Sequence, residues 1–434
     1  MEQGKLSGLL PIFVFLLLFI GSGVLFHDFY RMPAIVAFLV AFLAAFLQRN
    51  KHGLEEKLII ATRSMGQENV MLMCIIFLLA GAFSGAVTAA GGVESTVNFS
   101  LSILPPSVAV AGLFIISCFI SLSMGTSVGT IAALTPIAMG ISAKAGFPAA
   151  MCLAAVVGGA MFGDNLSIIS DTTIAATRTQ GCRMNDKFKE NFWIVLPAAV
   201  LTLCLFLFLA SDTAYGIEGD LDYSLLRILP YMVVLIGALL GGNVFLVLFG
   251  GTILSVIVGV ATGAMPWDQV FRMVAGGPDG KGGIMSMYDI TAISLVVAGV
   301  IGLVKENGGI QYILDHIKGL VHGPRGAQAG IAVVGSLVDI ATANNTIAIV
   351  MAGSIVKDIA EEYHISPKRA ASLIDIFTSV WQGLLPYGAQ ILYACAGAAA
   401  AGVYVTPFDL WPYLFYPVLM GVCAVGWILF RKPV

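Results

Sequence analysis

The chain has 434 residues, of which 58% are hydrophobic and 11% are charged, and its mean hydropathy is +0.94. These values exclude a soluble globular protein and indicate a polytopic membrane protein. The formal net charge of −3 gives no indication of a nucleic-acid partner. The seven cysteines lie singly, without the paired spacing of a metal site or a disulfide framework, and we expect no cofactor.

Long apolar segments follow one another along the chain. In the first half they are 8–26, 33–48, 70–89, 107–142, 148–180 and 190–210. In the second half they are 226–242, 244–263, 285–305, 327–356, 367–400 and 408–430. Most are long enough to cross a hydrocarbon core of about 30 Å as a helix. Polar and helix-loosening residues interrupt four of them, so we expect 107–142 and 327–356 to be re-entrant helical hairpins and 148–180 and 367–400 to be interrupted helices.

The two halves carry the same order of segments, which predicts an internal duplication with units 1–215 and 216–434. Gly129 to Ala132 resembles Asn345 to Ala348 at a shift of 216, and Pro197 matches Pro417 at a shift of 220. Five full crossings in each half, an odd number, would place the halves in opposite orientations. The predicted fold is therefore all-α, with two inverted repeats of five transmembrane helices, each with a hairpin and an interrupted helix.

Positive charges cluster on one side of this topology, which predicts that both termini are cytoplasmic and that the protein lies among the lipids of the plasma membrane, in a bacterium the inner membrane. These charges are Arg49, Lys51, Lys57, Arg63, Arg178, Arg183, Lys187, Lys189, Lys305, Lys318, Arg325, Lys357, Lys368, Arg369, Arg431 and Lys432. The loop at 211–223, which is acidic, falls on the opposite side.

Four polar clusters, at 121–130, 162–173, 336–346 and 377–390, lie within the interrupted segments. Asp164 and Asp171 are seven residues apart, so a helix would present both on one face. We expect no lysine or arginine at the same depth in the membrane, which leaves these carboxylates without a fixed counter-charge. Carboxylates inside a membrane are costly and usually functional, and Asp339 and Asp375 are secondary candidates on the same reasoning.

A carboxylate in a poorly hydrated site without a fixed counter-charge keeps its proton until a cation displaces it. Na⁺ and H⁺ would then compete for one site. If the site reorients only when it is occupied, this competition produces cation/proton exchange. We therefore expect Na⁺ to bind at Asp164 and Asp171.

Two strings carry a family resemblance: "GDNLSIISDTTIAATRTQG" at 163–181 and "MGTSVGTIAALTPIAMGISAKAG" at 124–146. Together they resemble the signature region of the NhaC family of Na⁺/H⁺ antiporters, and the resemblance extends over most of the chain. One departure is Ile168, where the family string often has proline. The resemblance implies a cation and proton site at Asp164, Asn165, Ser167, Ser170, Asp171 and Thr172, with a hairpin tip at Thr126, Ser127 and Thr130. The internal symmetry adds Asn344, Asn345 and Thr346 as the second tip.

Two alternatives stay open. The first is a Na⁺- or H⁺-coupled carrier of a small carboxylate or amino acid, since Gln382 and Gln390, with Asn344 and Asn345, could bind such a solute; we expect no buried arginine to supply its counter-charge. The second is an intramembrane aspartyl protease, although Met161 stands where the Gly-x-Gly-Asp motif of those enzymes has its first glycine. We expect a transporter, not an enzyme, either as a monomer or as a homodimer.

Overall fold

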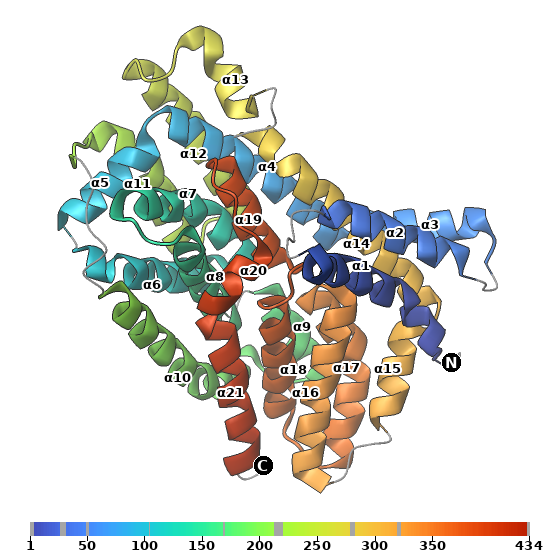
Figure 1. The fold of residues 1–434 in the computed structure, drawn as a ribbon. Coiled ribbons are helices and arrows are strands. Elements are labelled where there is room, and N and C mark those ends of the chain that lie inside the picture. The colour runs from blue at the N-terminus through green and yellow to red at the C-terminus, as the bar shows by residue number, and fades with distance from the viewer. Residues whose placement is uncertain are drawn as a thin grey trace.

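The computed structural model describes residues 4–26, 32–48, 52–103, 105–167, 170–211, 220–277, 283–318 and 323–431. These residues form helices and contain no strand, as Figure 1 shows. Within these described ranges, seven helices are long and apolar enough to cross a membrane, or up to eight if a bent pair near the C-terminus is one span. The predicted all-α polytopic membrane fold is confirmed.

The chain begins with apolar helices and one amphipathic helix. The elements are η1 (Leu6–Leu9), α1 (Leu10–Phe26), α2 (Ala34–Leu47), α3 (Leu54–Met65), α4 (Glu68–Ala89) and α5 (Gly92–Ile103). α1 and α2 pack through stacked aromatic rings, since the centroids of Phe15 and Phe38 are 3.9 Å apart. α3 carries Glu55 and Glu56 in its first turn and Arg63 in its last turn, which suits the helix dipole at both ends.

The next five helices contain the first hairpin and the first interrupted helix. They are α6 (Pro106–Met124), α7 (Ser127–Ala145), α8 (Ala149–Leu166), α9 (Asp171–Gln180) and α10 (Met184–Ala210). Gly125, Gly146 and Gly181 end α6, α7 and α9 with φ values of +68°, +74° and +71°. Glycine adopts this left-handed conformation without a steric penalty, so each of these helices ends at its glycine.

The remaining elements repeat this order. Before the second hairpin lie α11 (Leu225–Leu239), α12 (Val244–Ala261), η2 (Trp267–Gln269), α13 (Val270–Ala275), η3 (Ile284–Met287), α14 (Tyr288–Glu306) and α15 (Gly309–Lys318). The hairpin is α16 (Gly323–Thr342) and α17 (Asn345–Glu362), and the second interrupted helix is α18 (Pro367–Gln382) and α19 (Ala389–Ala400). The last elements are α20 (Pro407–Leu410), η4 (Trp411–Tyr413) and α21 (Phe415–Phe430).

Helix boundaries recur at a constant shift between the two halves. α6 ends at residue 124 and α16 at residue 342, while α9 begins at residue 171 and α19 at residue 389, so both shifts are 218. The two hairpin tips are also capped alike: Thr126 accepts a hydrogen bond from the Gly129 amide at 3.3 Å, and Asn344 accepts one from the Ile347 amide at 3.0 Å. The opposite orientation of the halves and the boundary at 215–216 remain predictions.

The first hairpin is packed closely against the interrupted helix. A Cβ atom on Gly159 would lie 2.2 Å from the Phe114 carbonyl oxygen, and one on Gly163 would lie 2.3 Å from the Cys118 carbonyl oxygen. These two glycines, one helical turn apart on α8, therefore let its backbone approach that of α6. In Figure 1 the helices α16, α17, α18 and α21 run side by side in the lower part of the molecule, while α4, α12 and α14 lie above them.

Candidate functional site

Asp164 lies in the last turn of α8 and is 7% exposed. Its Oδ2 accepts a hydrogen bond of 3.0 Å from the Ser127 hydroxyl, at the start of α7. The Gln390 amide donates to the same hydroxyl oxygen at 3.1 Å. The second oxygen, Oδ1, has no hydrogen-bond partner among the described residues. The first hairpin tip and α19 thus meet at one carboxylate, and that carboxylate retains an open ligand position.

Asp171 is the first residue of α9, on the other side of the break. Its Oδ2 accepts a hydrogen bond of 2.8 Å from the Thr346 hydroxyl of the second hairpin, and its Oδ1 accepts one of 3.0 Å from the Thr172 amide. Unlike Asp164, the Asp171 side chain is exposed. Each hairpin therefore contributes one hydroxyl to one of the two carboxylates, and one of these carboxylates is open to solvent.

Two of the polar side chains at the break between α8 and α9 form hydrogen bonds with other side chains, and one does not. Asn165 donates to the Ser379 hydroxyl of α18 at 2.9 Å, and the hydroxyl oxygens of Ser170 and Thr172 lie 3.0 Å apart. The Ser167 hydroxyl is buried without a partner among the described residues. Ile168, the departure from the family string, lies outside the described residues.

The other predicted tip residues shape the hairpins instead of contacting the carboxylates. Thr126 and Asn344 act as the caps described above, and Thr130 donates to the Thr126 carbonyl of its own helix at 3.0 Å. The Asn345 side chain accepts a hydrogen bond of 3.0 Å from the Thr346 amide. Their positions set where Ser127 and Thr346 point.

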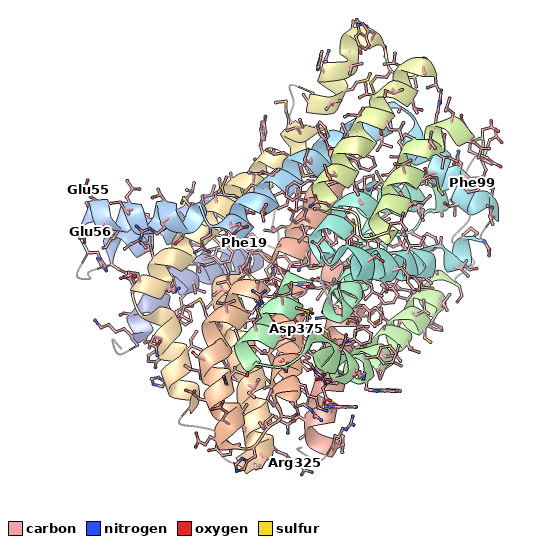
Figure 2. The ribbon with its side chains drawn as sticks, turned by 180° about the vertical axis from the view of Figure 1, so that it is seen from behind. Phe19, Glu55, Glu56, Phe99, Arg325 and Asp375 are labelled. Atoms are coloured by element: carbon pink, nitrogen blue, oxygen red, sulfur yellow. The ribbon has the colours of Figure 1, made fainter. Side chains whose placement is uncertain are left out.

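The expectation that no lysine lies among the buried acidic groups is wrong. Lys187, near the start of α10, is 1% exposed, and its Nζ lies 2.6 Å from Oδ2 of Asp375, which is 0% exposed. The same ammonium donates to the Asn165 carbonyl at 3.1 Å and to the Thr173 hydroxyl at 2.8 Å. Figure 2 shows Asp375 in the interior of the molecule. Asp375 is therefore the partner of a buried lysine, not a carboxylate without a counter-charge.

The expectation that no arginine is buried is also wrong. Arg369 of α18 is 4% exposed, and its Nε lies 2.5 Å from a carboxylate oxygen of Glu190 on α10. Its guanidinium also donates to the Gln328 side chain of α16 at 3.3 Å. These contacts occupy the guanidinium in joining α10, α16 and α18, so it is not free to bind a solute.

Three further predicted residues, Asp339, Gln382 and Gln390, form no direct hydrogen bond with Asp164 or Asp171. Asp339 is 0% exposed, and neither of its carboxylate oxygens has a partner among the described residues. Gln382 donates to the Ala343 carbonyl at the second hairpin tip at 3.2 Å, while Gln390 reaches Asp164 only through Ser127. The two glutamine amide nitrogens are thus engaged within the protein.

Sequence reasoning missed the buried face at the start of α10. Lys187, Asn191, Ile194 and Ala198 recur at three- and four-residue spacing and are all buried. This spacing indicates a single helix face that continues from the apolar segment into the polar run before it. Asn191 uses this position to donate to Oδ2 of Asp375 at 3.2 Å and to the Asn165 carbonyl at 3.0 Å.

No lysine or arginine pairs with Asp164 or Asp171 within the described part of the chain. Broken helices that bring carboxylates, hydroxyls and unwound backbone together inside an apolar helical protein define a class, the secondary transporters of small ions. The sequence profile of the Na⁺/H⁺ antiporter family matches residues 5–211 and 223–430. The chain belongs to this family.

Individual relatives are similar over nearly their whole length. The Malate-2H(+)/Na(+)-lactate antiporter of Bacillus subtilis (strain 168) is 22% identical, over 98% of this chain and 94% of that protein. The Na(+)/H(+) antiporter NhaC of Alkalihalophilus pseudofirmus is 22% identical, over 91% of this chain and 90% of that protein. The solved structure of the Alcanivorax borkumensis YdaH transporter aligns with a TM-score of 0.42 at 13% identity, over 99% of each chain.

Proposed function

We propose that the protein exchanges Na⁺ for H⁺, with Asp164 and Asp171 as the carboxylates that bind either ion. The observation that carries this proposal is the pair of hydroxyl contacts, from Ser127 of one hairpin to Asp164 and from Thr346 of the other to Asp171. Oxygen atoms of this kind, together with unwound backbone at a helix break, are the ligands that Na⁺ finds in transporters with broken helices.

Exchange follows from the absence of a fixed counter-charge. Asp164 is removed from bulk water, and a carboxylate in such a position is stable when it is protonated or when a cation lies beside it, but costly when it has neither. Binding of Na⁺ therefore releases a proton, and binding of a proton releases Na⁺. Because both hairpins contact the site, a motion of either hairpin relative to α8 and α9 would change the side from which the ions reach it.

In this proposal Lys187 holds the break and does not exchange protons with the cargo. Its ammonium has three donors, and its three partners are the Asn165 carbonyl, the Thr173 hydroxyl and Asp375. The lysine thus connects the end of α8, the start of α9 and the middle of α18. The charge of Asp375 is balanced locally, which leaves Asp164 and Asp171 to the transported ions.

Reconstituted protein tests the proposal. Liposomes that enclose a pH-sensitive dye receive Na⁺, Li⁺ or K⁺, and wild-type protein is expected to move protons opposite to Na⁺ without any organic solute. Asp164→Asn and Asp171→Asn should each reduce this signal at least tenfold. Asp222→Asn, at an exposed position, is the matched control and should leave the rate nearly unchanged. Full exchange activity in both site variants would refute the assignment.

The orientation and assembly are part of the same proposal. Both termini are cytoplasmic in an inner membrane, the transporter needs no cofactor, and a homodimer remains open. A cysteine placed at Ser211 should react with an impermeant reagent from the outside of intact cells. Reaction only from the cytoplasmic side would contradict this orientation.

A further inference from the structure

A cavity of about 280 Å³ lies beside the second hairpin tip, away from Asp164. Its lining comes from α3 and the start of α4, from α14, from the second hairpin tip and the first turns of α17, and from residues 387–392. Its volume is close to the lower end of the range of small-molecule sites, about 300 Å³. A bare Na⁺ needs far less space, so the volume suits an organic molecule.

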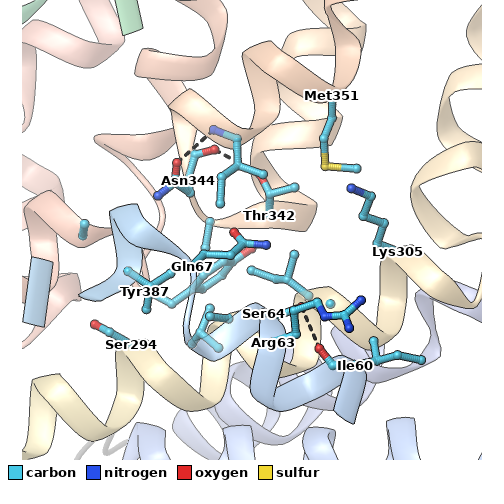
Figure 3. A pocket seen from close by; sticks show the side chains of 18 of the residues that line it. Ile60, Arg63, Ser64, Gln67, Ser294, Lys305, Thr342, Asn344, Met351 and Tyr387 are labelled. Atoms are coloured by element: carbon cyan, nitrogen blue, oxygen red, sulfur yellow. Dashed lines mark hydrogen bonds between the residues drawn. The ribbon is translucent and has the colours of Figure 1, made fainter. Parts of the chain in front are cut away.

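The charges at this cavity favour an anion. Arg63 and Lys305 both line it, and Figure 3 shows them on the side opposite Asn344. Neither cation has a hydrogen-bond or ion-pair partner in the part of the chain that the structure describes. Among the described residues of the lining the one acid is Glu306, whose Oε1 lies 2.9 Å from Nε2 of His52. The charge left for a ligand is therefore positive, which repels Na⁺ and attracts a carboxylate.

The remaining lining fits the rest of a small organic anion. Asn344 uses its side-chain oxygen to cap α17, and its amide nitrogen donates to no described residue, so it is available to an acceptor. Val70, Val297 and Leu392 supply an apolar wall. A molecule with one or two carboxylates on a short carbon chain satisfies both parts of this lining.

We propose that this pocket binds a small soluble organic carboxylate, held by Arg63 and Lys305, and that its binding is coupled to Na⁺ binding at Asp171. The coupling runs through one turn of the second hairpin: Asn344 lines the pocket, and Thr346, two residues further on, donates to Asp171 at 2.8 Å. Whatever orders this turn favours both sites, and by linkage each ligand must change the affinity of the other by the same factor. The coupling rests on the proposed cation site, while binding in the pocket does not.

Equilibrium binding tests the pocket. Wild-type protein in nanodiscs of zwitterionic lipid is titrated with radiolabelled lactate and malate. Arg63→Gln and Lys305→Gln should each raise Kd about tenfold or more, since each removes a charged hydrogen-bond donor. Lys357→Gln, at an exposed lysine outside the pocket, should leave Kd unchanged. Retained Na⁺/H⁺ exchange in the two pocket variants shows that they are folded.

Four results would overturn the proposal. Wild-type protein that binds neither probe has no such site, and a Kd unchanged in both pocket variants places the site elsewhere. Binding of a labelled anionic lipid that is lost in Arg63→Gln, and that lactate and malate do not displace, assigns the pocket to a lipid headgroup. Saturating Na⁺ should lower the Kd for the carboxylate about fivefold or more in wild type but not in Asp171→Asn. If the Kd does not fall in wild type, or falls equally in the variant, the two sites are not coupled. Binding without Na⁺/H⁺ exchange would refute the proposed function and leave the pocket assigned.

Discussion

The buried pair of Lys187 and Asp375 allows a sharp test of what holds the helix break in place. In Lys187→Met the carboxylate of Asp375 stays buried at 0% exposure without its counter-charge. The Thr173 hydroxyl loses a donor 2.8 Å away, whereas the Asn165 carbonyl keeps the Asn191 amide at 3.0 Å. The damage is therefore concentrated on the unpaired charge.

The expected cost is large because one partner of a buried pair is removed. Breaking such a pair costs about 3–5 kcal/mol in the free energy of unfolding, whereas replacing both partners by apolar residues of similar size is often neutral. Lys187→Met and Asp375→Leu should each fall in the first range. The double variant should be more stable than either single variant, because neither charge is then left alone.

The assay is unfolding of the purified protein in mixed micelles with added dodecyl sulfate, followed by circular dichroism. Lys357→Met is the control, because its ion pair with Glu361 is exposed and 3.9 Å long. Such surface pairs contribute between about 0 and 1 kcal/mol, so this variant should resemble wild type. If Lys187→Met also resembles wild type, or the double variant is less stable than both single variants, the buried pair does not hold the break as described.

Three further predictions follow from the hairpin tips. Ser127→Ala removes the hydroxyl that donates to Asp164 and should raise the half-saturating Na⁺ concentration about tenfold, measured by dye-loaded liposomes, since a hydrogen bond to a charged group is worth about 1.5–3 kcal/mol. Thr346→Val should raise the same concentration through the loss of its bond to Asp171. Ser100→Ala loses only a hydrogen bond to its own helix and should leave the concentration unchanged, so equal effects in all three variants would contradict the site. Gly125→Ala should lower stability by about 1–2 kcal/mol in the micelle assay because the tip requires φ of +68°, and a stability equal to wild type would refute this strain.

The interrupted helices could be predicted closely from the sequence. The segment expected at 148–180 is formed by α8 and α9, which begin at residue 149 and end at residue 180. The hairpin tips also lie within the predicted polar clusters at 121–130 and 336–346. The reason is local: glycine, hydroxyl and amide residues that loosen and cap a helix stand within a few residues of the break that they cause.

The partner of Lys187 could not be predicted in the same way. A lysine just before an apolar segment usually marks the cytoplasmic end of a span, and the rule of positive charges treats it so. Its burial depends on Asp375, which is remote in sequence and approaches only when α10 packs against α18. The same holds for Arg369 and Glu190, since each charge is stable inside the protein only because the other is there.

In the proposed mechanism Na⁺ and H⁺ compete for the carboxylates at the break between α8 and α9. The half-saturating Na⁺ concentration, measured at several pH values with equal pH on both sides of the liposome membrane, decides whether they compete. While the site is largely protonated, each unit fall in pH should raise this concentration about tenfold for every proton exchanged per ion, with the maximal rate little changed. A half-saturating concentration that stays constant from about pH 6 to 9, with only the maximal rate changing, would show that the proton does not occupy the cation site.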